Sequence, residues 1–155
     1  MTDSIDARLT ALGIELPAPA APVASFVPCV RAGNLLFVSG QVTAWNGELR
    51  HVGKVGRDVD LAEARAAARL CALNVLAHVR AALGTLDRVA RVVQVQGFVN
   101  AVPEFGEHPR VIDGASELLV ELFGREAGSH ARFAVGAGSL PFGVAVEVAA
   151  TFEVA

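Results

Sequence analysis

The segment just before the C-terminal alanine constrains the fold most. Residues 144–154 read VAVEVAATFEV, and every second residue, from Val144 to Phe152, is apolar. This period of two predicts a β-strand with one buried face. The opposite face carries Glu147 and Glu153 among alanines, so it is too apolar for open water and too charged for a core. A polar pocket covered by another subunit explains both properties.

The rest of the chain alternates short apolar runs with two long helical patterns, and this order predicts an α+β fold in which one mixed sheet carries both helices on one face. The final strand, 144–154, follows a turn at SLPFG. In the first part of the chain we expect a short helix at 4–12, capped by Asp3 or Ser4, and then strands at 26–31 and 35–39 joined by a turn at Gly33–Asn34. Pro28 predicts that the first of these strands lies at the sheet edge, and we expect turns around a short strand in 40–60.

The second part of the chain contains the two long helices. We expect one from Asp60 to Leu83, ended by Gly84, and the other from Pro109 to Phe123, ended by Gly124. Between them we expect a strand at 89–99, in which Val93 and Val95 alternate with Gln94 and Gln96, and after them a strand at 131–137.

Length and composition favour a single domain over residues 1–155, with an N-terminal helix and a Pro/Ala-rich connector at 1–23. The chain is 53% hydrophobic with a mean hydropathy of +0.47. It is therefore too apolar for disorder. Charges interrupt every apolar run, so we expect no membrane span. We expect the surplus apolar surface to be covered by further copies of the chain.

Charge and motif content exclude several classes of function. The net charge of −3, a pI near 5.8 and a single lysine, Lys54, argue against a nucleic-acid partner. The four histidines and two cysteines show no metal-ligand spacing, and no phosphate-binding loop is present, so we expect no metal and no cofactor. The N-terminus lacks a signal-peptide pattern. We therefore expect a cytoplasmic protein in which Cys29 and Cys71 are reduced thiols.

Arg132 and Glu147 are the residues with the clearest chemical potential. If the last two strands pair as a hairpin about Leu140–Pro141, the two charges lie on one face as diagonal neighbours. Small residues such as Ala134 then leave space above them, in which the arginine could grip a carboxylate with two hydrogen bonds. The alternative is an ordinary cross-strand ion pair. The residues alone leave both interpretations open.

Two motifs resemble the Rid (reactive intermediate deaminase) family, also known as the YjgF-like or endoribonuclease L-PSP family. The first is RFAVGAGSLP at 132–141 followed by VEV at 146–148. The second is GNLLFVSGQ at 33–41, which is similar to the family's GN-x4-SGQ hairpin. The resemblance covers residues 24–154.

The resemblance implies a chorismate-mutase-like fold and a homotrimer with clefts between subunits. It implies that Arg132 holds a substrate carboxylate and that Glu147 positions a water that attacks an imine carbon. The other pocket residues that it implies are Phe26, Ser39, Gly40, Ala134 and Ser116. Phe26 stands where the deaminases have Tyr, Ala134 where Cys or Thr is common, and Ser116 is nearest to a family asparagine.

Three functions follow as hypotheses. The first is an enamine/imine deaminase, like those acting on 2-iminobutanoate and 2-iminopropanoate, that converts small 2-imino acids to 2-keto acids and ammonia. The second, favoured by the missing tyrosine hydroxyl at Phe26, is a non-catalytic binder or sensor of a small carboxylate metabolite. The third is an endoribonuclease, which the acidic pI and the single lysine disfavour.

Overall fold

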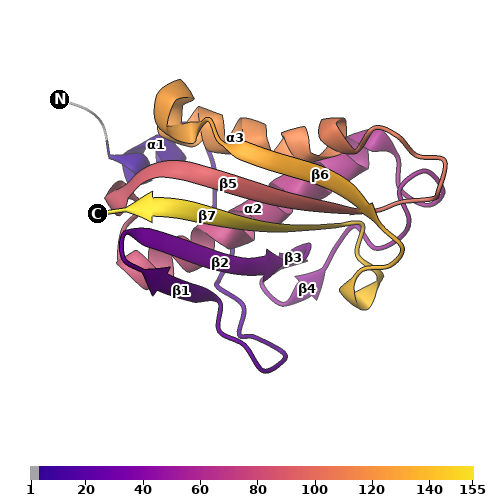
Figure 1. Ribbon diagram of the computed structural model, residues 1–155, viewed down its shortest axis with the longest axis horizontal. Coiled ribbons are helices and arrows are strands. Elements are labelled where there is room, and N and C mark those ends of the chain that lie inside the picture. Colours follow the sequence, from indigo (N-terminus) through magenta and orange to yellow (C-terminus); the bar gives the residue numbers. More distant parts are fainter. Residues whose placement is uncertain (1–3) are drawn as a thin grey trace.

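A computed structural model describes residues 4–155 (Figure 1). The principal elements are α1 (Ile5–Ala11), β1 (Cys29–Ala32), β2 (Leu35–Gln41), β3 (Ala44–Trp45), β4 (Glu48–Leu49), α2 (Leu61–Leu83), β5 (Val89–Asn100), α3 (His108–Gly128), β6 (Ala131–Ala137) and β7 (Val146–Val154). Short 3-10 turns cover Leu86–Arg88 and Pro141–Gly143. The short helix, the first hairpin, the two long helices and the last three strands therefore all occur in the predicted order. The first strand was predicted to start at residue 26 but starts at Cys29, and the last starts at Val146, two residues later than predicted.

The five long strands form one mixed sheet in the order β1-β2-β7-β5-β6. All neighbours are antiparallel except β5 and β6, which run parallel. Helix α3 connects these two strands and returns the chain to the end at which β5 began, as a parallel pair requires. The predicted mixed sheet and the edge position of β1 are confirmed, although Pro28 precedes this strand and does not lie within it.

The predicted hairpin between the last two strands is wrong. β5 lies between β6 and β7, so these two strands share no ladder (Figure 1). Their connection, residues 138–145, is longer than a tight hairpin turn and carries the chain across β5. The sequence pattern specified which side chains alternate along each strand, but it did not specify the partner strand.

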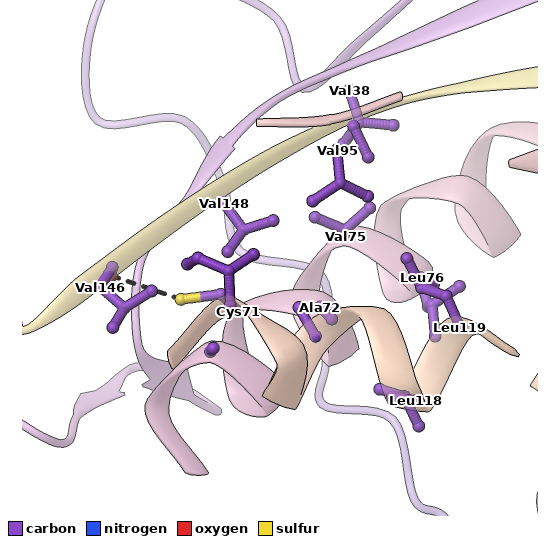
Figure 2. Close-up of a cluster of buried hydrophobic side chains, with 14 of the residues drawn as sticks. Val38, Cys71, Ala72, Val75, Leu76, Val95, Leu118, Leu119, Val146 and Val148 are labelled. Atoms are coloured by element: carbon purple, nitrogen blue, oxygen red, sulfur yellow. Dashed lines mark hydrogen bonds between the residues drawn. The ribbon is translucent and has the colours of Figure 1, made fainter. Parts of the chain in front are cut away.

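Both long helices cover one face of the sheet, as predicted (Figure 1). On β7, the alternate residues from Val146 to Val154 are buried, while those from Glu147 to Glu153 are half-buried on the other, open face. Figure 2 shows the contact between the layers: Cys71, Ala72, Val75 and Leu76 of α2 and Leu118 and Leu119 of α3 face Val38, Val95, Val146 and Val148 of the sheet.

Local signals account for the position of α2. The Asp60 side chain accepts a hydrogen bond from the backbone N–H of Glu63 at 2.8 Å, and Gly84 ends the helix with φ 84°. By length and composition alone α2 could cross a membrane. However, 67% of its most apolar window is buried inside the fold, which identifies it as the core helix of a two-layer domain.

Small residues allow α2 and α3 to approach closely. An added Cβ at Gly114 of α3 would lie 2.1 Å from the backbone oxygen of Arg65 on α2. Fully buried alanines line the same layer, including Ala64, Ala67 and Ala115. The high alanine content is therefore explained in part by the short distance between the helices.

The ends of the helices differ slightly from the prediction. Ser4 caps α1, with its hydroxyl accepting from the backbone N–H of Ala7. The alternative cap, Asp3, lies outside the described residues. Gly124 breaks the regular helix as predicted, with φ 87° and ψ 165°, but one further turn to Gly128 is added before β6.

The alternation expected in β5 is wrong at its start. An irregularity between Val92 and Gln94 shifts the register with β7. Val92 and Val95 are consequently both buried, whereas Val93 is only half-buried. A bulge of this kind inserts one residue and is not visible in a period-two pattern.

Candidate functional site

Arg132 lies on β6 and points toward α3. It is paired with Val95, which faces the helices, so Arg132 faces them as well. Its Nη1 lies 2.9 Å from Oδ1 of Asp113 and donates to Oγ of Ser116 at 3.0 Å, while Nη2 donates to the backbone oxygen of Pro109 at 2.9 Å. The side chain remains 22% exposed. The guanidinium is thus held in place by one helix and still meets solvent at the sheet edge.

Ser116 connects Arg132 to a histidine that the sequence analysis did not select. Its Oγ lies 2.8 Å from Nε2 of His130, and His130 Nδ1 lies 2.7 Å from the backbone oxygen of Gly128. A carbonyl can only accept, so Nδ1 carries the proton and Nε2 accepts from the Ser116 hydroxyl. Desolvation is the largest influence on the pKa of His130 and, together with the charge of Arg132, lowers it in spite of the opposing hydrogen bond to Gly128, which favours this neutral form.

Ala134 lies on the same side of β6 as Arg132, two residues along the strand. It pairs with Gly97 of β5, and an added Cβ at Gly97 would lie 2.5 Å from Ile112 of α3. The structure therefore brings three predicted site residues to the helix-facing side of β6: Arg132, Ser116 and Ala134. We call these three, with Asp113 and His130, the arginine half-site.

Glu147 lies on β7 and faces the open side of the sheet. It pairs with Phe98 of β5, and its carboxylate lies against the bare backbone of Gly40, where an added Cβ would be 2.3 Å from Oε2. Within residues 4–155 no group forms a hydrogen bond or ion pair with this carboxylate. Desolvation raises its pKa. Glu147 is thus a half-buried acceptor with free lone pairs beside Gly40.

Ser39 precedes Gly40 and holds the segment that carries Phe26. Its hydroxyl donates to the backbone oxygen of Val27 at 2.7 Å, and its backbone N–H donates to that of Pro28 at 2.9 Å. The side chain of Phe26 is exposed. Ser39 therefore positions this segment with its own proton, and its oxygen can still accept. We call Phe26, Ser39, Gly40 and Glu147 the glutamate half-site.

The two half-sites do not meet within one chain. Arg132 faces the helices and Glu147 faces the opposite side of the sheet. Strand β5 lies between the strands that carry them (Figure 1). The expected arrangement of Arg132 and Glu147 as diagonal neighbours on one face is wrong, because it depended on the absent hairpin. No cross-strand ion pair joins them either; Arg132 is paired with Asp113.

Sequence reasoning missed Asp113 and His130, although each left a signal. Asp113 and Ser116 are three residues apart on α3 and so share a helix face. His130 and Arg132 are two residues apart and so share a side of the strand. Recognising that these two pairs meet required the packing of α3 against β6.

The two cysteines are free thiols, as predicted. Burial raises the pKa of Cys29 and, much more strongly, that of Cys71. The Cys71 thiol donates to the backbone oxygen of Val146 at 3.3 Å (Figure 2). Among residues 4–155, no three His, Cys, Asp or Glu side chains are grouped as a metal site requires.

Comparisons with known proteins agree with this architecture over almost the whole chain. The Trypanosoma cruzi protein TCP17 is 48% identical over 149 residues, which are 96% of this chain and 93% of that protein. The solved structure of Atu1372 from Agrobacterium tumefaciens, a protein of unknown function, has 49% identity and a TM-score of 0.90, covering 97% of this chain and 92% of that one.

A solved structure from Shewanella oneidensis MR-1 has 36% identity and a TM-score of 0.94, and it covers 98% of this chain and 100% of its own. The family model described as "YjgF/chorismate_mutase-like, putative endoribonuclease" matches residues 6–152. These matches and the mixed two-layer sheet show that the chain belongs to the YjgF-like, endoribonuclease L-PSP family with its chorismate-mutase-like fold.

Proposed function

We propose that this chain is an enamine/imine deaminase that hydrolyses small 2-imino acids, R–C(=NH)–COO⁻ + H2O → R–CO–COO⁻ + NH3, in clefts between the subunits of a homotrimer. Water attacks the imine carbon and forms a C–O bond. The π electrons of the C=N bond move to nitrogen, which takes up the proton that the water gives up. In the resulting carbinolamine the hydroxyl proton then moves to nitrogen, the C–N bond breaks, and ammonia leaves together with the 2-keto acid. Family membership supports the general role in small-molecule chemistry, and the half-sites support this substrate class.

The state of Arg132 carries the proposal. Its Nη1 group is used by Asp113 and Ser116, and one N–H of Nη2 is used by the backbone oxygen of Pro109. A guanidinium has five N–H donors, and Nε–H forms no hydrogen bond within residues 4–155. Donors therefore remain for a carboxylate, on a side chain that is already held in position. Anchoring the carboxylate of a 2-imino acid this way reduces the entropy lost on the path to the transition state.

Glu147 supplies the second function, which is to orient the attacking water. Its free, half-buried carboxylate is a suitable acceptor for a water O–H. It cannot act on a substrate held by Arg132 of its own chain, because the two face opposite sides of the sheet. A cleft shared between copies would bring Arg132 of one copy to Glu147 of the next.

Exposed apolar side chains support association between copies. Phe37, Phe133 and Val135 are 45%, 38% and 42% exposed on the open face, and Val30 at the other edge is 53% exposed. Covering such side chains is a typical role of an obligate interface. Light scattering during gel filtration tests the assembly: we expect a mass near three chains, and a monomer at micromolar concentration would contradict the shared cleft.

The activity test measures the decay of imines generated in situ by an amino-acid oxidase. Arg132→Ala should lower kcat/KM by at least about tenfold, since a charged hydrogen-bonded anchor is lost. It should lower the affinity for pyruvate, the 2-keto acid formed from 2-iminopropanoate, by a similar factor. Arg132→Lys should restore little, because an ammonium lacks the planar fork. Arg125→Ala, at an exposed arginine near the end of α3, is the matched control and should leave both values unchanged. Wild-type activity equal to buffer would refute the proposal.

The second candidate is a non-catalytic binder of small carboxylates. The absence of a hydroxyl at Phe26 and at Ala134 favours it, because fewer groups remain to assist proton transfer. Glu147→Gln separates the two functions. In a deaminase it should lower kcat far more than affinity. A binder would show pyruvate binding without imine turnover in any variant.

A further inference from the structure

A directional chain of hydrogen bonds runs from the end of α3 to Arg132. His130 Nδ1–H donates to the backbone oxygen of Gly128, the Ser116 hydroxyl donates to His130 Nε2, and Arg132 Nη1–H donates to Ser116 Oγ. A hydroxyl has one hydrogen and two lone pairs. Because its hydrogen is used by His130, Ser116 presents only lone pairs to the guanidinium.

From this geometry we infer that His130 is a positioning residue for Arg132: by accepting the Ser116 proton, its neutral ring orients the serine oxygen as an acceptor that holds the guanidinium toward the substrate carboxylate. The inference rests on the proposed role of Arg132 as the carboxylate anchor. His130 itself touches no substrate in this scheme, and it acts only through Ser116.

The charges around His130 make its protonation state matter. Arg132 on β6 and Asp113 on α3 lie on the far side of Ser116, and Arg91 on β5 reaches the neighbouring backbone oxygen of Ser129 at 3.4 Å. A second proton would convert Nε2 into a donor that competes with Arg132 for the same oxygen. It would also place one cation on each side of Ser116, the His130 ring and the Arg132 guanidinium. Acidification should therefore loosen the hold on Arg132.

Calorimetric titration with pyruvate, between about pH 5 and pH 8 where histidine titrates, tests the inference. Ser116→Ala should weaken binding by about threefold to tenfold, the usual range for one lost hydrogen bond. His130→Leu should have the same effect. His130→Gln keeps an acceptor that does not titrate, so it should retain affinity at neutral pH and lose the weakening in acid.

One control lies next to His130 and the other is a histidine elsewhere in the fold. Ser129→Ala removes a hydroxyl that only donates to the backbone oxygen of Arg125, and His51→Asn removes a distant histidine whose φ of 52° suits asparagine. Both should bind pyruvate as the wild type does, with the same pH dependence. Wild-type affinity in Ser116→Ala, or an unchanged acid weakening in His130→Gln, would overturn the inference.

A measurement without ligand separates this inference from the proposed function. Nitrogen-15 NMR of the free protein should show His130 as the neutral tautomer with the proton on Nδ1, and should show restricted rotation of the Arg132 guanidinium. That restriction should be lost in folded Ser116→Ala. If the wild type failed to bind pyruvate, the proposed function would be wrong, but the NMR measurement on the free protein would still test the inference. A proton on Nε2 of His130, or unchanged rotation of the Arg132 guanidinium in Ser116→Ala, would overturn the inference. Labelling of Ser116 by a fluorophosphonate probe, which reacts with nucleophilic serines, would also overturn it.

Discussion

Gly40→Ala is the substitution that probes the glutamate half-site most directly. The new Cβ would lie 2.3 Å from Oε2 of Glu147, whereas ordinary contacts begin near 3.4 Å. The carboxylate must therefore retreat by about 1 Å. The contacts further back, 3.1 Å to Cδ and 3.4 Å to Cγ, are easily relieved by rotating a flexible side chain. A displacement of about 1 Å in a reacting group can cost roughly 100-fold in rate, and we expect a loss of that order in kcat.

The same substitution should leave folding almost unchanged. Gly40 does not have a positive φ, so alanine is tolerated by the backbone, and the reduced entropy of the unfolded chain contributes about 0.4–1 kcal/mol in favour of the fold. Thermal unfolding should therefore show a midpoint near that of the wild type. The pKa of Glu147 should fall toward its ordinary value, because the carboxylate moves out toward water.

The assay combines ammonia release from an in situ imine, thermal unfolding, and NMR titration of Glu147. Gly106→Ala is the matched control, since its Cβ would meet nothing within 4 Å and its φ is also ordinary. Turnover within twofold of wild type and an unchanged Glu147 pKa in Gly40→Ala would refute the reasoning. So would a Gly40→Ala chain that fails to fold, because the structure assigns the contact to a movable side-chain terminus.

Three further predictions concern stability and reactivity. Gly114→Ala should lower the free energy of unfolding by about 1–3 kcal/mol or more in urea denaturation, because its Cβ meets a backbone oxygen of Arg65 that cannot rotate away. Glu147 has a raised pKa, so its protonated form is favoured by folding and this contribution is lost as the pH rises through the folded-state pKa. Glu147→Gln should accordingly be more stable than the wild type at neutral pH and equal to it below the unfolded pKa. Cys71, whose thiol pKa burial raises, should react with a thiol reagent at pH 8 only as fast as the chain unfolds, and a reaction at the rate of a free thiol would contradict its burial.

Local signals allowed much of the fold to be predicted. Asp60 and Gly84 mark the ends of α2 through hydrogen bonds and a left-handed backbone that are determined within one turn. Gly33, with φ 61°, supplies the turn between β1 and β2. The alternation in β7 predicted which side is buried. Each of these features depends on residues close together in the chain.

Features that depend on distant pairing were not predictable in the same way. Alternation along β6 shows that Arg132 and Ala134 share a side, but not which side of the sheet that is. That side follows from the parallel pairing of β6 with β5. This pairing depends on the connection through α3, a helix of 21 residues that lies between the two strands in the sequence. The family resemblance named Arg132 and Glu147 together, and only the strand order shows that they belong to different half-sites.

The separation of Arg132 and Glu147 leads to a test in which two impaired variants restore each other. If each cleft takes Arg132 from one copy and Glu147 from the next, a mixed trimer of Arg132→Ala and Glu147→Gln chains contains some clefts with both native residues. Random association of equal amounts makes about a quarter of the clefts intact, because each cleft draws independently on one residue from each neighbour. Co-refolded mixtures should thus recover about a quarter of wild-type turnover, while each variant alone stays at about a tenth of it or below. Mixed trimers verified by two affinity tags, yet without any recovered activity, would show that the two residues do not work across a subunit boundary.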